Sequence, residues 1–121
     1  MDIERVVAKR LMDATGIKCV PDVPRERPDE FVQVTLAATS ATRFIQSPRV
    51  LATSWAKTRR RAREIAEAVE RACAAIEDEP NVFSAVPDGT YRWDDPDTGA
   101  PRYQTNINPV SYTNLRAHET G

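Results

Sequence analysis

The most strongly periodic stretch of apolar positions lies in the middle of the chain, where residues 49–79 begin as a strand and continue as a helix. Its apolar positions, separated by one or three residues, are Ala62, Ile65, Ala66, Val69, Ala72, Cys73 and Ile76. This spacing places them on one helical face. Most of these side chains are small, so the helix can pack closely on a sheet. The pattern predicts a core-facing helix, capped by Ser54 or Thr58.

A shorter helix is predicted at the N-terminus, ending near residue 14. Its apolar face consists of Ile3, Val6, Val7 and Leu11. Asp2 can cap its start, and Gly16 can end it in a left-handed conformation.

Runs of alternating or β-favouring residues predict about four to five strands. They cover residues 17–20, 31–37, 50–55, 81–86 and 102–107, with a short extended piece at 91–93. Turn-forming residues separate the later strands, and the proline-rich residues 21–30 form a surface connection. The element order is α-β-β-β-α-β-β. We therefore predict an α+β fold in which two helices pack on an antiparallel or mixed sheet.

The second and third strands are predicted to form a long projecting β-hairpin with a loop at residues 38–48. The loop contains Arg43, Phe44 and Ile45. Exposed apolar residues on a projecting element commonly mark a contact site. The alternative is that Phe44 and Ile45 fold back onto the domain.

The length of 121 residues fits one domain. We assign residues 1–108 to it. Residues 109–121 lack periodicity, and VSYTNLRAHETG resembles translated sequencing-adapter read-through, so we expect a non-native or disordered tail with no role. The sole histidine, His118, lies in that tail.

Charge is distributed unevenly along the chain although the formal net charge is only −1. Residues 41–63 carry seven basic side chains and no acidic one, whereas residues 64–101 carry ten acidic and two basic side chains. The two segments therefore have net charges of +7 and −8. Such polarity suits contacts between oppositely charged surfaces.

Recognisable catalytic chemistry is missing from the sequence. There is no nucleophile elbow, phosphate-binding loop or metal-ligand spacing, and we expect neither an enzyme nor a cofactor. Cys19 and Cys73 are predicted to be buried, reduced thiols. Asp94, Asp95 and Asp97 lack the spacing of a calcium loop and indicate a turn. No signal peptide or membrane-spanning run is present, so we expect a soluble protein.

The charged ends of the central helix oppose the helix dipole. Arg59, Arg60, Arg61 and Arg63 lie in its first turns, and Glu77, Asp78 and Glu79 lie at its end. Each misplaced exposed charge costs about 0.3–1 kcal/mol. One interpretation is a solvated helix with the local pairs Arg60–Glu64 and Arg63–Glu67. The other is that these charges, together with Arg49 and the loop residues Arg43, Phe44 and Ile45, face a neighbouring subunit or a nucleic acid.

Three segments resemble the tail terminator proteins of long-tailed bacteriophages. They are the hairpin FVQVTLAATSATRFIQSPRVLATSWA, the strand-to-helix junction SWAKTRRRAREIAEAVERAC and the turn GTYRWDDPDTGAPRYQ. Together they span residues 31–104, within a matching order of elements from about residue 3 to 107. The departure is at the end, where the family would have a few more β residues.

The resemblance implies a non-enzymatic structural protein of the virion. Such a protein forms a ring, generally a hexamer, at the head-proximal end of the tail. Its implied partners are further copies of itself, the tail tube protein and a head-completion protein, without a membrane or a specific nucleic acid, and it would be assembled in the host cytoplasm. The alternatives are another head–tail connector and a small nucleic-acid-binding module that uses the arginines from Arg59 to Arg63.

Overall fold

The computed structural model describes residues 3–41, 45–80 and 82–112, of which 38–41, 45–48, 83 and 110–112 are described as backbone only. The elements are α1 (Ile3–Thr15), β1 (Cys19–Val20), β2 (Phe31–Ala41), β3 (Ile45–Trp55), α2 (Arg59–Ala72), the 3₁₀ helix η1 (Cys73–Asp78), β4 (Val82–Arg92) and β5 (Arg102–Tyr112). Their order confirms the predicted order of helices and strands.

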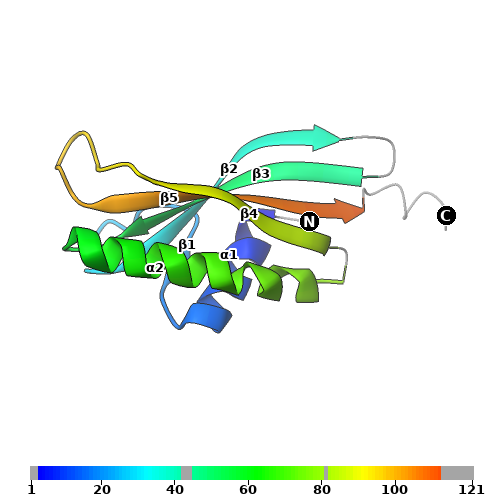
Figure 1. Ribbon diagram of the computed structural model, residues 1–121, viewed down its shortest axis with the longest axis horizontal. Helices are drawn as coiled ribbons and strands as arrows, with labels where there is room; N and C mark the ends of the chain where they lie inside the picture. The colour runs from blue at the N-terminus through cyan, green and yellow to red at the C-terminus, as the bar shows by residue number, and fades with distance from the viewer. Residues whose placement is uncertain (1–2, 42–44, 81, 113–121) are drawn as a thin grey trace.

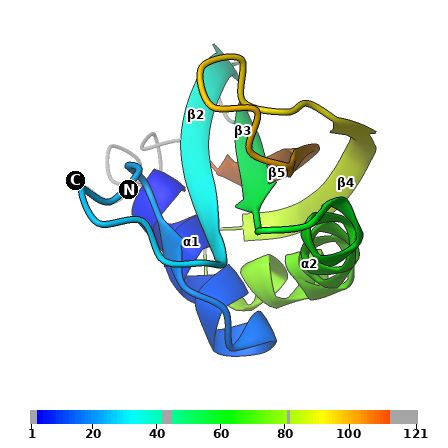
Figure 2. The same ribbon diagram turned by 90° about the vertical axis from the view of Figure 1, so that its left-hand side faces the viewer.

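The five strands form one mixed sheet in the order β1-β2-β3-β5-β4. Only β1 is parallel to its neighbour; the pairs β2–β3, β3–β5 and β4–β5 are antiparallel. Both helices lie on the same side of the sheet (Figures 1 and 2). This arrangement confirms the predicted α+β class.

The hydrophobic core lies between the sheet and the two helices. On β2 and β3, Val32, Val34, Val50 and Ala52 alternate with residues of the opposite face and are fully buried. The register places Val34 opposite Ala52, so these side chains share the face toward the helices. From α2, Ile65 and Val69 complete the core. The predicted apolar stripe of α2 is therefore confirmed as its core-facing side.

Capping hydrogen bonds define the end of α1 and the start of α2. Gly16 follows α1 with a φ of 73°, and its N–H donates to Met12 O at 2.8 Å. Thr58 caps α2, its hydroxyl accepting from Arg61 N at 3.1 Å. The expected single helix to residue 79 is wrong, because 3₁₀ turns follow Ala72. With three residues per turn, these turns keep Cys73 and Ile76 on one buried face.

Strands β2 and β3 are longer than the sequence suggested. Residues 38–41 pair with residues 46–49, so the expected ten-residue loop is wrong. Residues 38–41 contain no Gly, Pro, Asn or Asp, so no strong turn former ends the strand there. The link at residues 42–44 is outside the described residues, and the projecting hairpin stays a prediction.

Strand β4 is continuous where two short pieces separated by a turn were expected. The segment Pro87-Asp88-Gly89 forms an irregularity within it, with a register shift between Pro87 and Thr90. Gly89 has a φ of 94°, which a bulge can require and glycine accepts readily. Because β4 is an outer strand of the sheet, Pro87 can be accommodated there.

Strand β5 continues through Asn108 and Pro109, where the sequence predicted its end. Pro109 is fully buried and opposite Ala85 on β4. On the β3 side, no paired residues fall between Ile107 and Ser111. The proline therefore sits where its missing N–H interrupts no ladder. The expected domain boundary after residue 108 falls inside β5.

Candidate functional site

A basic patch formed by Arg59, Arg60 and Arg63 surrounds Tyr103 at the start of α2. These four residues line a shallow cavity of about 180 Å³. The Thr58 cap fixes the first turn of α2 and so places Arg59 and Arg60 on exposed positions. Neither arginine makes an ion pair within the described part of the chain, whereas Arg63 lies 3.5 Å from Glu67, as predicted. The guanidiniums of Arg59 and Arg60 therefore remain available to bind an anionic group.

Arg61 belongs to a different set of contacts although it is adjacent in sequence. Its Nε donates to Glu30 Oε2 at 2.6 Å and its second amino group to Glu30 Oε1 at 3.1 Å. This hydrogen bond, with the guanidinium charge, lowers the pKa of the Glu30 carboxyl. Arg61 also lies 3.6 Å from Glu64. Arg60 makes no ion pair within the described part of the chain, so the predicted Arg60–Glu64 pair is wrong. The bidentate pair ties α2 to the connection before β2.

The acidic residues after α2 mostly contact their own chain. Glu77 accepts a hydrogen bond from Ala85 N at 2.9 Å, and Glu79 pairs with Arg10 at 2.8 Å. Asp78 is exposed and has no ion pair among the described residues. Two of the three carboxylates at this end therefore already have partners within the subunit.

The remaining predicted interface residues lie apart from the basic patch. Arg49 is exposed on β3, six positions before Trp55. Six residues of a strand span about 20 Å, so Arg49 is far from the end of β3 that leads into α2 and the basic patch. Arg43 and Phe44 lie outside the described residues, as does the side chain of Ile45. The structure therefore does not place the predicted residues in one site.

An aromatic cluster at the end of the sheet was missed by the sequence analysis. Phe31 is opposite Trp55 in the β2–β3 register, and their rings stack with centroids 5.3 Å apart. Arg102 is opposite Trp55 on β5, and its guanidinium lies 4.9 Å from the Trp55 ring centroid and 4.2 Å from that of Trp93. Arg102 Nε also donates to Trp93 O at 2.7 Å. These contacts fasten the β4–β5 connection to the sheet.

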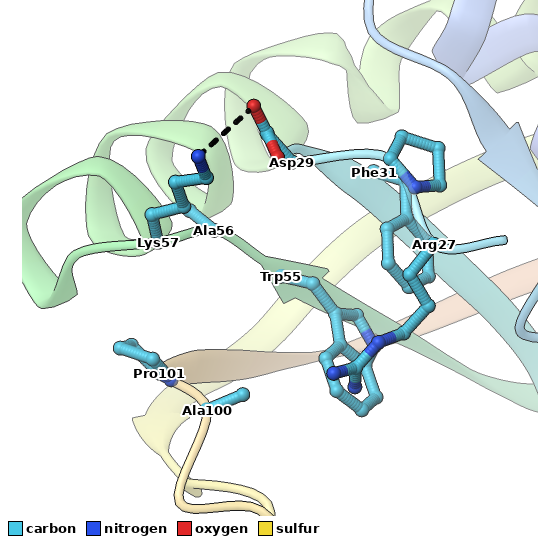
Figure 3. A pocket seen from close by; sticks show the side chains of 9 residues that line it. Arg27, Asp29, Phe31, Trp55, Ala56, Lys57, Ala100 and Pro101 are labelled. Atoms are coloured by element: carbon cyan, nitrogen blue, oxygen red, sulfur yellow. Dashed lines mark ion pairs between the residues drawn. The ribbon is translucent and has the colours of Figure 1, made fainter.

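A pocket of about 510 Å³ opens beside this cluster (Figure 3). Its lining comes from three stretches of the chain: Arg27, Pro28, Asp29, Phe31, Trp55, Ala56, Lys57, Ala100 and Pro101. Lys57 lies 3.4 Å from Asp29 at the rim. The guanidinium of Arg27 is 5.0 Å from the Trp55 ring centroid. The pocket thus combines apolar walls with two cationic rim residues, of which Lys57, and not Arg27, is paired with the acidic Asp29.

Two polar groups beside this pocket are incompletely paired. Trp55 is 6% exposed, yet its Nε1 has no hydrogen-bond partner among the described residues. The carboxylate nearest to Arg27, that of Asp95, is 4.0 Å away. Asp95 also accepts hydrogen bonds from Thr98 Oγ1 at 2.6 Å and from Asp97 N at 3.3 Å, and these hydrogen bonds lower its pKa. Arg27 therefore retains donor capacity for another anion.

One feature of the sequence could have predicted the contact between Trp55 and Arg102. Trp55 ends a strand and Arg102 opens one, so an antiparallel pairing brings them together. Residues 21–30 were interpreted only as a surface connection and residues 94–101 only as a turn, but both contribute walls.

The described residues offer binding chemistry and no metal site. No group of three or more His, Cys, Asp or Glu side chains in the described ranges could hold a metal ion. No described helix is both long and apolar enough to cross a membrane. No protein-family model and no curated protein matches the chain.

Proposed function

We propose that this chain is a structural subunit that assembles head to tail into a ring, like the tail terminator proteins that it resembles. In this role its partners are neighbouring copies, the tail tube protein and a head-completion protein, and it belongs to the virion. The observation that carries the proposal is the basic patch, where Arg59 and Arg60 are exposed and make no ion pair among the described residues. A head-to-tail ring needs such a surface, because each subunit uses two different faces.

The energetics of the helix start support a partner for the basic patch. Exposed cations in the first turn of a helix are unfavourable by about 0.3–1 kcal/mol each. The isolated subunit does not offset this cost at Arg59 and Arg60 with ion pairs in its described part. Carboxylates from an adjacent subunit would offset it on assembly and would favour one docking orientation.

A nucleic-acid-binding module is less well supported. Single-stranded nucleic acids stack their bases on accessible aromatic faces. Phe31 and Trp55 are 1% and 6% exposed, so their rings are not free for stacking, whereas Tyr91 and Trp93 are 46% and 48% exposed. Charge is therefore what opposes nucleic-acid binding. Acidic residues such as Asp29, Asp94 and Asp97 also lie among the basic ones at this end of the sheet. That mixture opposes a polyanion but allows contacts with single carboxylates.

Native mass spectrometry combined with light scattering tests the ring proposal. The wild-type chain should form a closed oligomer, with a hexamer expected, whose population grows with concentration. The double variant Arg59→Gln/Arg60→Gln should weaken assembly by about tenfold or more, the size of one close charge pair across an interface. Arg71→Gln is the matched control, because Arg71 is exposed on the last turn of the same helix.

Two results would contradict the proposal. One is a stable two-fold dimer formed through α2, because its symmetry closes the assembly. The other is unchanged assembly of the double variant. In a parallel anisotropy measurement with single-stranded DNA, we expect no binding near physiological salt, and a sequence-selective complex there would favour the nucleic-acid alternative.

A further inference from the structure

The pocket beside Trp55 has the chemistry of a site for a carboxylate attached to an apolar segment. Its accessible apolar wall is formed by Pro28, Ala100 and Pro101, because Phe31 and Trp55, which also line it, are only 1% and 6% exposed. Arg27 and Lys57 stand at the rim, and their side chains are 38% and 75% exposed. Trp55 Nε1 lacks a partner among the described residues, but the atom is buried and is not a donor at the pocket surface. A ligand oxygen near Arg27 would find cationic donors, and its neighbouring side chain would find the apolar surface of the prolines.

A segment with the complementary chemistry protrudes from the outer strand β4. Among the large hydrophobic residues whose side chains the structure describes, Val86 is the most exposed, at 56%. Asp88 is exposed two positions later, in the bulge that Gly89 permits. Its carboxylate has one weak neutral partner, Asn108 Nδ2 at 3.2 Å, and no ion pair among the described residues. The sequence Val86-Pro87-Asp88 therefore presents an apolar side chain, a flat ring and an acid together.

We propose that the pocket beside Trp55 docks the segment Val86-Pro87-Asp88 of a second copy of this chain. The Asp88 carboxylate would bind the Arg27 guanidinium, and Val86 and Pro87 would pack on the wall of Pro28, Ala100 and Pro101. This inference rests on the proposed ring and names a contact within it that is separate from the basic patch.

The positions of the two features suit a head-to-tail contact. Strand β3 ends and β5 begins at the left of Figure 1, and the pocket is lined by residues at these two ends. The Val86–Asp88 segment lies midway along β4, one of the two outer strands of the sheet. One is at an end of the sheet and the other is along its side, so a single subunit presents two different surfaces. Repeating such a contact can close a ring.

Charge reversal with reciprocal rescue tests this contact in the full chain. We would measure self-association of the wild type and of Arg27→Glu, Asp88→Arg and the double reversal by sedimentation and native mass spectrometry. Each single reversal should weaken association by about tenfold or more, and the double reversal should restore most of it. Lys9→Glu, an exposed reversal on α1, is the control. Circular dichroism melting verifies that every variant folds.

Tryptophan fluorescence provides an independent measurement of the pocket. The chain contains two tryptophans, and both Trp55 and Trp93 belong to this cluster. The capped peptide acetyl-Ala-Val-Pro-Asp-Gly-amide should change the emission of the wild-type chain. The same peptide with Asn in place of Asp should have a much smaller effect, as should the acidic peptide added to Arg27→Glu.

The possible results separate this contact from the ring itself. Assembly that is unaffected by Arg27→Glu, or that the double reversal fails to restore, overturns the pocket contact and leaves the ring standing. A chain that binds the acidic peptide without self-associating places the acidic segment on a different protein, which overturns both the second-copy assignment and the ring. Equal fluorescence responses to the Asp and Asn peptides overturn the carboxylate specificity.

Discussion

The double variant Arg59→Gln/Arg60→Gln should make the isolated subunit more stable even as it weakens assembly. Both arginines lie in the first turn of α2, directly after the Thr58 cap, where the helix dipole disfavours positive charge. Glutamine keeps a similar helix propensity and length, so the substitution changes mainly charge. Neither arginine has an ion pair to lose in the described part of the chain, although Arg59 exerts a weak favourable charge effect on Asp94.

The expected gain follows from the position of the two charges. Removing one misplaced exposed cation contributes about 0.3–1 kcal/mol, so two should contribute about 1 kcal/mol in total at low salt. For a chain of 121 residues, this corresponds to a rise in melting temperature of about 3–5 °C. The gain should shrink in about 1 M salt, where the Debye length falls to about 3 Å. Arg71→Gln, in the last turn of α2, should lose stability, because a cation is favourable there.

Thermal and urea unfolding of the dilute, unassembled subunit at low and high salt would measure these differences. Equal or lower stability of the double variant at low salt would refute the reasoning. It would mean that the two guanidiniums have favourable contacts within the subunit. The energetics of the helix start would then no longer support binding of a partner at the basic patch. A gain that persists in high salt would also refute it, because the effect would not be electrostatic.

Three further predictions concern the subunit itself. Ile65→Ala removes a fully buried side chain from α2 and should reduce the free energy of unfolding by about 2–5 kcal/mol. Urea titration should show this loss with an unchanged m value, and a loss below about 1 kcal/mol would contradict the core assignment. Deleting residues 109–121 should cost more than about 1 kcal/mol, because Pro109 is buried and residues 109–111 pair with β4; an unchanged melting temperature would show that this pairing contributes little. Burial raises the thiol pKa of Cys19 and Cys73 to about 12, so both should resist alkylation at pH 8 in the folded chain, and rapid native-state labelling would contradict this. The contribution of the buried neutral thiols to the free energy of unfolding should be present below about pH 9 and lost toward pH 12.

The helices and the buried strand faces could be predicted because they depend on local periodicity. The apolar stripe from Ala62 to Val69 and the alternation in residues 31–37 each indicate one buried face. Thr58 and Gly16 were identified because capping depends on a few neighbouring residues. Burial of both cysteines was predicted and is confirmed, as is their free state.

Strand lengths and the pocket could not be predicted because they depend on tertiary pairing. Pro109 looked like a strand terminator, but the β3 ladder is interrupted beside it, so the proline is tolerated. Pro87 and Gly89 looked like a turn, but an outer strand accepts them as a bulge. The pocket combines residues from positions 27 to 101, and no local pattern reports that assembly. Likewise, the partners of Arg61 and Glu79 are far away in sequence, at Glu30 and Arg10.

Two glutamates cover backbone donors at the open edges of the sheet, which bears on how chains can associate. Glu77 accepts a hydrogen bond from Ala85 N on the outer strand β4, and Glu4 accepts one from Leu36 N on β2, beyond the two residues paired with β1. In each case a carboxylate from a helical segment occupies a backbone donor that an incoming strand would otherwise use. Unprotected edges recruit other chains into uncontrolled, amyloid-like stacking. By occupying a donor on each edge and placing negative charge there, the two side chains would favour association through side-chain surfaces over endless strand addition.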